Sequence, residues 1–280
     1  MNIFTRFSNG WNIAMNSWSV LKENRQLILF PILSGISLVL VIASFFLIAF
    51  ASVGWNFEGF RDIQDQSTAV HYAIVFVYYL VNYFIIVFFN TALIHCTHLY
   101  FNGEKPTIRQ GLQFAFSRIG VLLSWAAFAA TVGTALRLLQ DNLGSIGKFI
   151  TGLIGIVWSV TTFFVVPVIA YENLGPIAAF KRSATMMKEK WGERLGAGFS
   201  FGLIQLLSFI VLAAVGALLG WAIHPLVGIA VFILGVFSVL VLVSAVRTIF
   251  ISAVYHNING DPVKNFNQQF ADNLFVTKAK

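Results

Sequence analysis

Charged side chains are scarce in this sequence, and their scarcity excludes most soluble folds. Only 10% of the 280 residues are Asp, Glu, Lys or Arg, whereas 58% are hydrophobic. A soluble domain carries roughly 25% charged residues, and a larger core does not account for the deficit, because a soluble protein must still cover its surface with polar groups. Lipid as the solvent removes that requirement. The composition therefore predicts an integral membrane protein.

Cysteine and catalytic motifs are also sparse. Cys96 is the only cysteine, which excludes an intrachain disulfide and a cysteine-rich metal site. The sequence has no phosphate-binding Walker loop and no His-Glu-x-x-His zinc motif. Ionisable groups are rare inside the apolar runs, although ion-coupled transporters depend on them. We therefore expect no cofactor and no enzymatic activity.

Six apolar runs are long enough to cross a bilayer, whose hydrocarbon core requires ~20 residues of helix. They lie at approximately Leu27–Val53, Ala69–Leu93, Ile119–Leu136, Phe149–Ala170, Phe199–Ile223 and Leu226–Val254. Only His224 and Pro225 separate the last two runs, which predicts a tight hairpin. Pro167 is expected to kink the fourth run, because proline lacks an N–H and clashes with the carbonyl four residues earlier.

The 18 basic residues are distributed unevenly among the segments that connect these runs. Fifteen fall on the side that holds both termini, and only Arg61, Arg137 and Lys148 fall on the other side. Cytoplasmic loops carry the excess of Lys and Arg, so we expect a multi-pass protein of the inner (cytoplasmic) membrane with both termini cytoplasmic. Anionic lipid headgroups explain the net charge of +7, and no nucleic-acid partner is expected.

Connecting segments on the predicted cytoplasmic side carry apolar residues at helical spacing, which is typical of amphipathic helices. A shift of 166 residues superposes the N-terminal stripe on that of residues 177–191 and places Ser17 on Ser183. A shift of 157 places Asn102-Gly103 on Asn259-Gly260. These helices are expected either to lie among lipid headgroups or to pack on the bundle. The predicted organisation is a single membrane domain of residues 1–280, with repeat units at approximately 1–100, 101–172 and 173–257 and a cytoplasmic amphipathic tail at 258–280.

The expected fold is an all-α polytopic membrane bundle, with about six transmembrane helices in three hairpins and amphipathic helices on the cytoplasmic side. Short motifs resemble those of uncharacterised six-span bacterial membrane proteins; they lie at residues 171–176 (Tyr-Glu-Asn-Leu-Gly-Pro), 178–183 (Ala-Ala-Phe-Lys-Arg-Ser), 187–188, 18–22 and 29–31. Residues 171–188 are also similar to the membrane domain fused to some glycerophosphodiester phosphodiesterases. The resemblance implies a fold but no activity, because the phosphodiesterase catalytic domain is not present.

Polar residues inside the apolar runs are candidates for function, since polar groups in hydrocarbon are costly. Asn82, Asn90 and Gln205 fit the lining of a polar path, and they fit equally well hydrogen bonds between helices. His95 and His98 are three residues apart on a helix and can reach one metal ion. No acidic residue accompanies them closely, so ordinary interfacial histidines are the alternative.

Three basic residues are candidate contacts to lipid phosphate, because arginine forms bidentate contacts with phosphate and long basic side chains reach the headgroups: Arg247, Lys181 and Arg182. Four glycines at small-xxx-small spacing permit close helix approach, either within the chain or between copies of it: Gly198, Gly202, Gly216 and Gly220. Membrane lipids and a second copy of the chain are the expected partners.

Three functions are compatible with these features. The first is a non-enzymatic membrane protein that binds or moves an amphiphile such as a lipid, or organises a membrane complex. The second is a channel or passive small-molecule transporter, with Asn82, Asn90 and Gln205 facing its lumen. The third is an intramembrane metal-dependent enzyme that uses His95 and His98.

Overall fold

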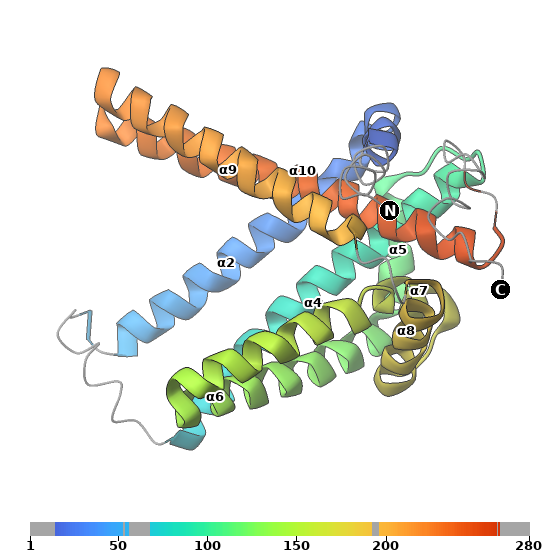
Figure 1. The fold of residues 1–280 in the computed structure, drawn as a ribbon, viewed down its shortest axis with the longest axis horizontal. Helices are drawn as coiled ribbons and strands as arrows, with labels where there is room; N and C mark the ends of the chain where they lie inside the picture. The colour runs from blue at the N-terminus through green and yellow to red at the C-terminus, as the bar shows by residue number, and fades with distance from the viewer. Residues whose placement is uncertain (1–14, 53, 56–67, 192–195, 262, 264–280) are drawn as a thin grey trace. The chain divides into compact units, whose positions relative to one another are not determined.

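The computed structural model describes residues 15–52, 54–55, 68–191, 196–261 and 263, and these form helices joined by turns (Figure 1). Helical residues 15–23 come first. The elements that follow are η1 (Arg25–Ile28), α2 (Leu29–Ser52), α4 (Thr68–Phe101), α5 (Ile108–Ser117), α6 (Ile119–Thr161), α7 (Val165–Glu172), α8 (Pro176–Trp191), α9 (Gly196–Ala222) and α10 (Pro225–Ile258). No strand occurs in the described ranges, so the all-α prediction is confirmed for them.

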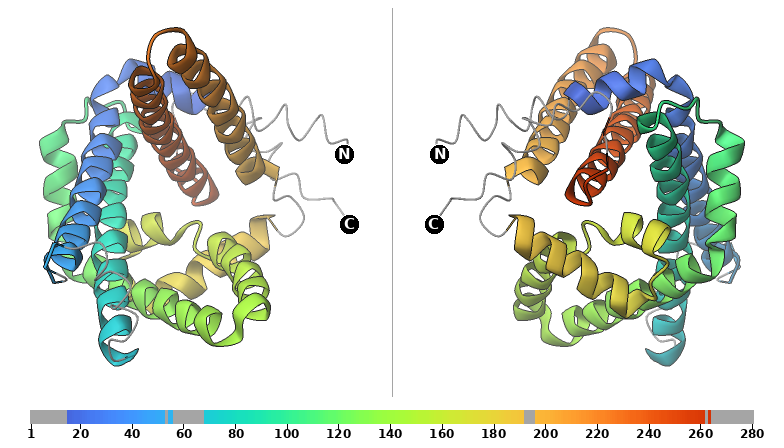
Figure 2. Two further views of the ribbon diagram at one scale, coloured as in Figure 1. Left: turned by 90° about the vertical axis from the view of Figure 1, so that its left-hand side faces the viewer. Right: turned by 90° about the vertical axis from the view of Figure 1, so that its right-hand side faces the viewer.

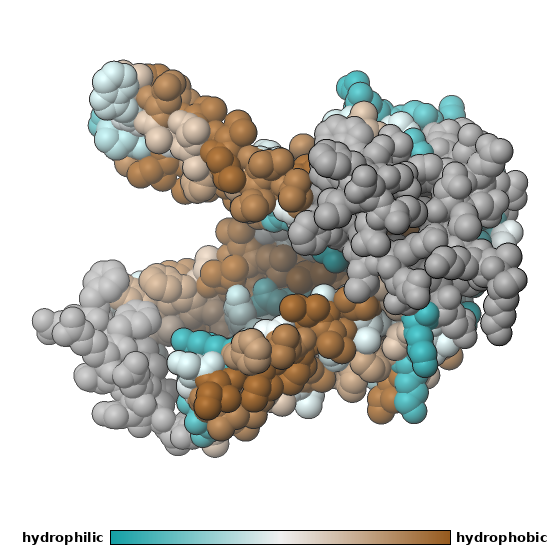
Figure 3. All heavy atoms as spheres, in the orientation of Figure 1, coloured by the Kyte–Doolittle hydropathy of each residue, from teal (hydrophilic) through white to brown (hydrophobic). Residues whose placement is uncertain are grey.

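Five helices are long and apolar enough to cross a membrane: Arg25–Ser52, Ala69–Phe101, Ile119–Thr161, Phe201–Ala222 and Pro225–Ile258. Large apolar side chains point outward along them; Leu40 is 64% exposed and Leu234 is 67% exposed. Hydrophobic residues cover much of the visible surface of α6 and of the α9–α10 pair (Figure 3). Soluble proteins rarely expose apolar surface on this scale, which makes this chain a membrane protein.

The third and fourth predicted runs are parts of one element, α6. Residues 137–148, expected to form a loop, are helical except at Gly144, where φ is 55° and ψ is −127°, a combination that favours glycine. The chain reverses there, because the Trp125 and Trp158 rings stack with centroids 6.0 Å apart, whereas 33 residues of straight helix would span about 50 Å. The prediction that the helix ends near Leu136 is therefore wrong.

A second interruption lies ahead of Pro167, as the proline predicts. Helix α6 ends at Thr161 and α7 begins at Val165, so the break falls on residues 162–164. The Pro167 ring excludes a regular helix at the carbonyl four residues earlier. Ser183 of α8 accepts a hydrogen bond from the Phe164 N–H at 3.0 Å, which satisfies one backbone group at the break.

The chain packs as two compact units. The α9–α10 unit comprises Met1–Ile32, Ala92–Leu112 and Met186–Lys280, and the α6 unit comprises Leu33–Thr91 and Gln113–Thr185. In the α6 unit, the rings of Phe128, Trp158 and Phe180 pack together at centroid distances of 5.6–6.3 Å. These contacts hold α8 against both arms of the folded α6.

In the α9–α10 unit, the two long helices lie side by side, as both views of Figure 2 show. Helix α10 begins at Pro225, and the His224 ring nitrogen Nδ1 accepts a hydrogen bond from the Leu226 N–H at 3.2 Å. In the same unit, Gly111 of α5 allows a close approach to α4. A Cβ at Gly111 would lie 2.7 Å from Cys96 Sγ and 2.7 Å from Phe30 Cζ.

Helices α4 and α10 end in the same way, at positions related by the predicted shift of 157. Gly103 and Gly260 both have φ of 84°. Glu104 N–H donates to the Leu99 carbonyl at 3.0 Å and Asp261 N–H to the His256 carbonyl at 2.9 Å, the pattern of a Schellman cap. The three-unit repeat extends well beyond these two turns and stays a prediction.

The buried face of α8 differs from the predicted stripe. Ile177, expected on the apolar face, is 59% exposed, whereas Ala179 and Ser183 are fully buried. The helix is rotated because Ser183 reaches the Phe164 N–H and the small Ala179 permits close packing. In the N-terminal segment, Ser17 and Val20 are fully buried, so the described parts of both segments pack on protein; residues 1–14 lie outside the described ranges.

Candidate functional site

An apolar cavity of about 220 Å³ lies within the α9–α10 unit. Its wall consists of Met15 and Trp18 from helical residues 15–23, Phe201, Ile204 and Ser208 from α9, and Val239, Leu242, Val243 and Val246 from α10. Spacings of three, four and seven residues place each set on one face of its helix. The Ser208 hydroxyl donates to the Ile204 carbonyl at 2.8 Å, so the wall presents almost only hydrocarbon.

The cavity exists because α9 and α10 are close at one end and held apart at the other. Near the turn, Gly228 packs on Gly216 and Gly220; a Cβ at Gly228 would lie 2.7 Å from the Gly220 Cα. Toward the opposite end, Phe201 and Phe250 face each other with ring centroids 5.8 Å apart. Large side chains there leave space that the two helices alone do not fill.

Helical residues 15–23 close one side of the cavity and are fixed to protein. The Tyr100 hydroxyl of α4 donates to the Glu23 carboxylate, and the Gln26 side-chain amide donates to the Pro106 carbonyl. Within the segment, the Val20 side chain is fully buried. These contacts anchor the C-terminal end of the helical segment that carries Trp18.

Two basic residues lie next to residues of the cavity wall, although neither is part of the wall itself. The Lys22 ammonium lies 5.9 Å from the centroid of the Trp18 ring, within the range of a cation–π contact. Arg247 directly follows Val246 on α10 and is exposed. Lys22 was not among the sequence candidates, although its position four residues after a tryptophan on a helix is a signal that could have identified it.

The other two candidate phosphate contacts lie on α8 in the α6 unit. Lys181 is exposed. The Arg182 Nε lies 3.1 Å from a Glu172 carboxylate oxygen, so its guanidinium already has an anionic partner. Of the three predicted residues, only Arg247 adjoins the cavity.

The predicted polar residues do not line the cavity. The Asn82 side-chain amide donates to the Tyr78 carbonyl of its own helix at 2.6 Å, and Asn90 lies two turns further along α4 in the α6 unit. Gln205 lies on α9 in the other unit, half-buried. Asn82 therefore bonds within its own helix, and none of the three residues is part of the cavity wall.

The histidines form a contact at the ends of α4 and α10. The rings of His98 and His256 stack with centroids 4.3 Å apart, and His256 Nδ1 lies 2.8 Å from an Asp261 carboxylate oxygen. His95 is half-buried one turn earlier on α4. Within the described ranges, no group of three or more His, Cys, Asp and Glu side chains is close enough to hold a metal ion.

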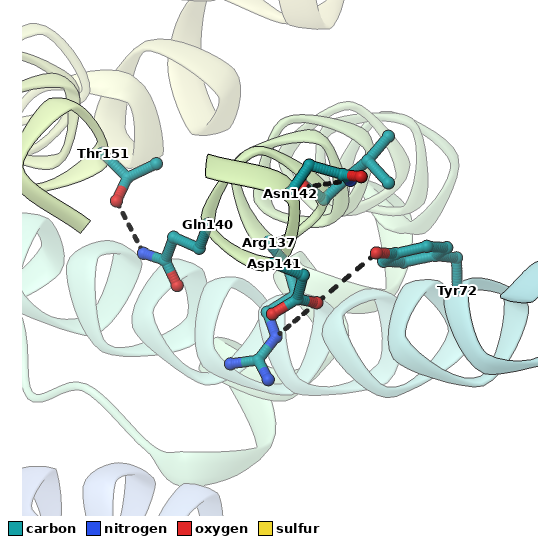
Figure 4. A network of polar contacts seen from close by, with 7 residues as sticks. Tyr72, Arg137, Gln140, Asp141, Asn142 and Thr151 are labelled. Carbon is teal, nitrogen blue, oxygen red and sulfur yellow. Dashed lines mark hydrogen bonds and ion pairs between the residues drawn. The ribbon is translucent and has the colours of Figure 1, made fainter. Parts of the chain in front are cut away.

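A polar network surrounds the reversal of α6 in the α6 unit (Figure 4). The Asp141 carboxylate accepts from Arg137 Nε at 3.2 Å and from the Tyr72 hydroxyl of α4 at 3.4 Å. Across the turn, the Gln140 amide donates to the Thr151 hydroxyl at 2.7 Å. Each of these contacts joins parts of the α6 unit, so the network holds the reversed chain together.

The predicted glycine positions separate into two groups. Gly216 and Gly220 face Gly228 inside the chain, whereas a Cβ at Gly202 would meet open space. Gly198 begins the pattern Gly-Phe-Ser-Phe-Gly, which matches the Gly-x-Ser-x-Gly spacing of hydrolases; the side chains of residues 196–200 lie outside the described part of the structure. The pattern lies within helix α9, whereas a nucleophile elbow requires a turn between a strand and a helix.

Comparison with known proteins identifies a family and no characterised relative. Residues 69–262 match the model of DUF6159, a family of unknown function. No curated protein and no solved structure matches the chain. The matched segment contains every α9 and α10 residue of the cavity wall, while Met15 and Trp18 precede it. Since the match covers more than half of the sequence, the chain belongs to DUF6159, an uncharacterised family.

Proposed function

We propose that this protein is a non-enzymatic integral membrane protein that binds a membrane lipid, with one acyl chain of the lipid in the cavity of the α9–α10 unit. The observation that carries the proposal is the wall of that cavity: eight of the nine residues around it are apolar, and the hydroxyl of the ninth is bonded within its own helix. A hydrocarbon chain satisfies such a wall, and water would lack partners there.

The location of the cavity supports a lipid rather than a soluble ligand. The outward faces of α9 and α10 carry exposed apolar residues, among them Leu206, Ile210 and Ile233, and these faces meet hydrocarbon in a bilayer. A chain can pass from the bilayer to the cavity without crossing water. The elongated arrangement of Ser208, Ile204 and Phe201 along α9 suits an extended chain.

The proposed topology has six crossings in the inner membrane, with both termini cytoplasmic. The reversal of α6 at Gly144 supports two crossings from that single element, and the other four long helices supply one crossing each. The distribution of Lys and Arg supports the orientation. The similarity of residues 171–188 to the membrane domain of some glycerophosphodiester phosphodiesterases stays a prediction.

Trp18 provides a direct test, because its ring lines the cavity. The full chain would be reconstituted in nanodiscs with phospholipids brominated along the acyl chain, which quench tryptophan fluorescence on contact. The chain contains seven tryptophans, so the Trp18 signal is the difference between the wild type and Trp18→Phe. We expect this difference to be quenched strongly by brominated chains.

A matched pair of variants separates the cavity from the general lipid surface. Ser208→Phe fills part of the cavity and should reduce the quenching of Trp18, whereas Leu206→Phe, at a position that is 58% exposed on the opposite face of the same helix, should leave quenching unchanged. Equal quenching in both variants, or no quenching of Trp18 by any lipid, would overturn the proposal.

A further inference from the structure

We infer that the bound lipid is an anionic phospholipid, whose phosphate is held by Lys22 and Arg247 at the mouth of the cavity; this inference rests on the proposed function. The apolar wall explains the binding of an acyl chain but does not specify the headgroup of the lipid. The headgroup is specified by the side chains at the end of the cavity where the chain must leave it.

The depth of the cavity along α10 identifies that end. Arg247 follows Pro225, the first residue of α10, by 22 residues, or about 33 Å of helix. A hydrocarbon core is about 30 Å thick, so with Pro225 at one boundary Arg247 reaches the opposite headgroup layer. Val239 and Val246 then lie in the acyl layer just beneath it, where the chain of a lipid from that leaflet extends.

We place Lys22 at the same end of the cavity, because of its contact with Trp18. Trp18 forms part of the wall, and the Lys22 ammonium is held 5.9 Å from its ring centroid. Tryptophan favours the boundary between headgroups and chains, and the ammonium one turn further along the helix extends toward the headgroups. The lysine is therefore positioned beside the mouth.

The charges around the mouth favour an anion. Among the described residues, no carboxylate forms an ion pair with Lys22 or Arg247. The nearest acid in sequence, Glu23, accepts a hydrogen bond from Tyr100, which directs its carboxylate toward α4. Arginine and lysine both bind phosphate, arginine through two parallel hydrogen bonds. Two cations beside one phosphate leave one positive charge in excess, which favours a headgroup of net negative charge and disfavours a headgroup that carries its own ammonium group.

The test compares two brominated lipids in the same reconstituted full chain. Brominated phosphatidylglycerol and brominated phosphatidylcholine are titrated separately at equal mole fraction, and quenching of Trp18 reports occupancy. We expect the wild type to prefer phosphatidylglycerol, with each basic residue contributing about fivefold. Lys22→Gln/Arg247→Gln should lose this preference and still be quenched by phosphatidylcholine.

The control removes two basic residues that do not adjoin the cavity. Lys105 and Arg109 are exposed in the same unit, and Lys105→Gln/Arg109→Gln should retain the preference. Equal loss in both double variants would assign the preference to bulk surface charge and overturn the inference. Equal quenching of the wild type by both lipids would overturn it too, while leaving the proposed function intact; absence of quenching by either lipid would refute the proposed function itself.

Discussion

Filling part of the cavity should make the stability of the protein less dependent on lipid. Ser208 lies in the α9 wall, and replacing it with phenylalanine places a ring where we propose that an acyl chain lies. The serine hydroxyl bonds only to the Ile204 carbonyl of its own helix, a group that already takes part in the helix. The substitution therefore removes one hydrogen bond within α9 and adds apolar contacts between the new ring and the cavity wall.

The volume of the cavity sets the size of the effect. Unfilled volume in a protein interior costs about 24 cal/mol per Å³, which would be ~5 kcal/mol for an enclosed cavity of about 220 Å³; this cavity is open on one side, so leaving it empty costs clearly less than that. The wild type should lose stability within this limit when lipid is removed. Ser208→Phe should lose less, because its ring occupies part of the same space.

The assay compares unfolding free energies in nanodiscs and after exchange into a rigid steroid detergent, which has no flexible chain to enter the cavity. Leu206→Phe, on the exposed face of α9 opposite the cavity wall, is the control and should behave as the wild type. A Ser208→Phe protein as sensitive to lipid removal as the wild type would refute the reasoning, since the space would then not be what lipid fills.

Three substitutions test the packing that shapes the fold. Gly111→Ala should destabilise by ~1–3 kcal/mol, because the new methyl group overlaps neighbouring atoms of α4 and η1–α2; a stability change near zero would show that the helices can separate freely. Gly228→Ala should cost a similar amount and open the α9–α10 pair, measured by SDS unfolding, whereas Gly202→Ala, which meets open space, serves as the control for both glycines. Ser183→Ala should cost ~1–3 kcal/mol through the unsatisfied N–H at the break before α7, and Ser159→Ala, an exposed serine on α6, should cost little; equal effects of the two would contradict the role of the buried hydroxyl.

The long helices could be predicted from the sequence because hydrocarbon thickness imposes a length that apolar runs reveal directly. The turn at His224 and Pro225 could be predicted equally well, since two residues between two apolar runs are too few for any connection other than a tight turn. The helical structure of residues 137–148 could not be predicted in the same way. Those residues are polar enough to suggest a loop, and their helix depends on tertiary contacts such as Tyr72 with Asp141 and Gln140 with Thr151.

The cavity could not be predicted from the sequence. Its wall combines residues separated by more than 200 positions, from Met15 to Val246, and every one of them except Ser208 reads as an ordinary lipid-facing or core residue. Polar residues in apolar runs drew attention to Asn82 instead, whose amide bonds to its own helix. An apolar site carries no unusual residue type, so only the packing of three helices identifies it. Of the predicted phosphate contacts, only Arg247 lies on a helix of the cavity wall, directly after Val246.

Photo-crosslinking tests the central claim most directly. A phospholipid with a diazirine along its acyl chain would be incorporated with the full protein into nanodiscs, activated by light, and its adducts mapped by mass spectrometry. We expect adducts on Ile204 and Leu242, inside the cavity, and their loss in Ser208→Phe. Adducts confined to outward-facing residues such as Leu206 and Ile233, and unchanged in that variant, would contradict the account.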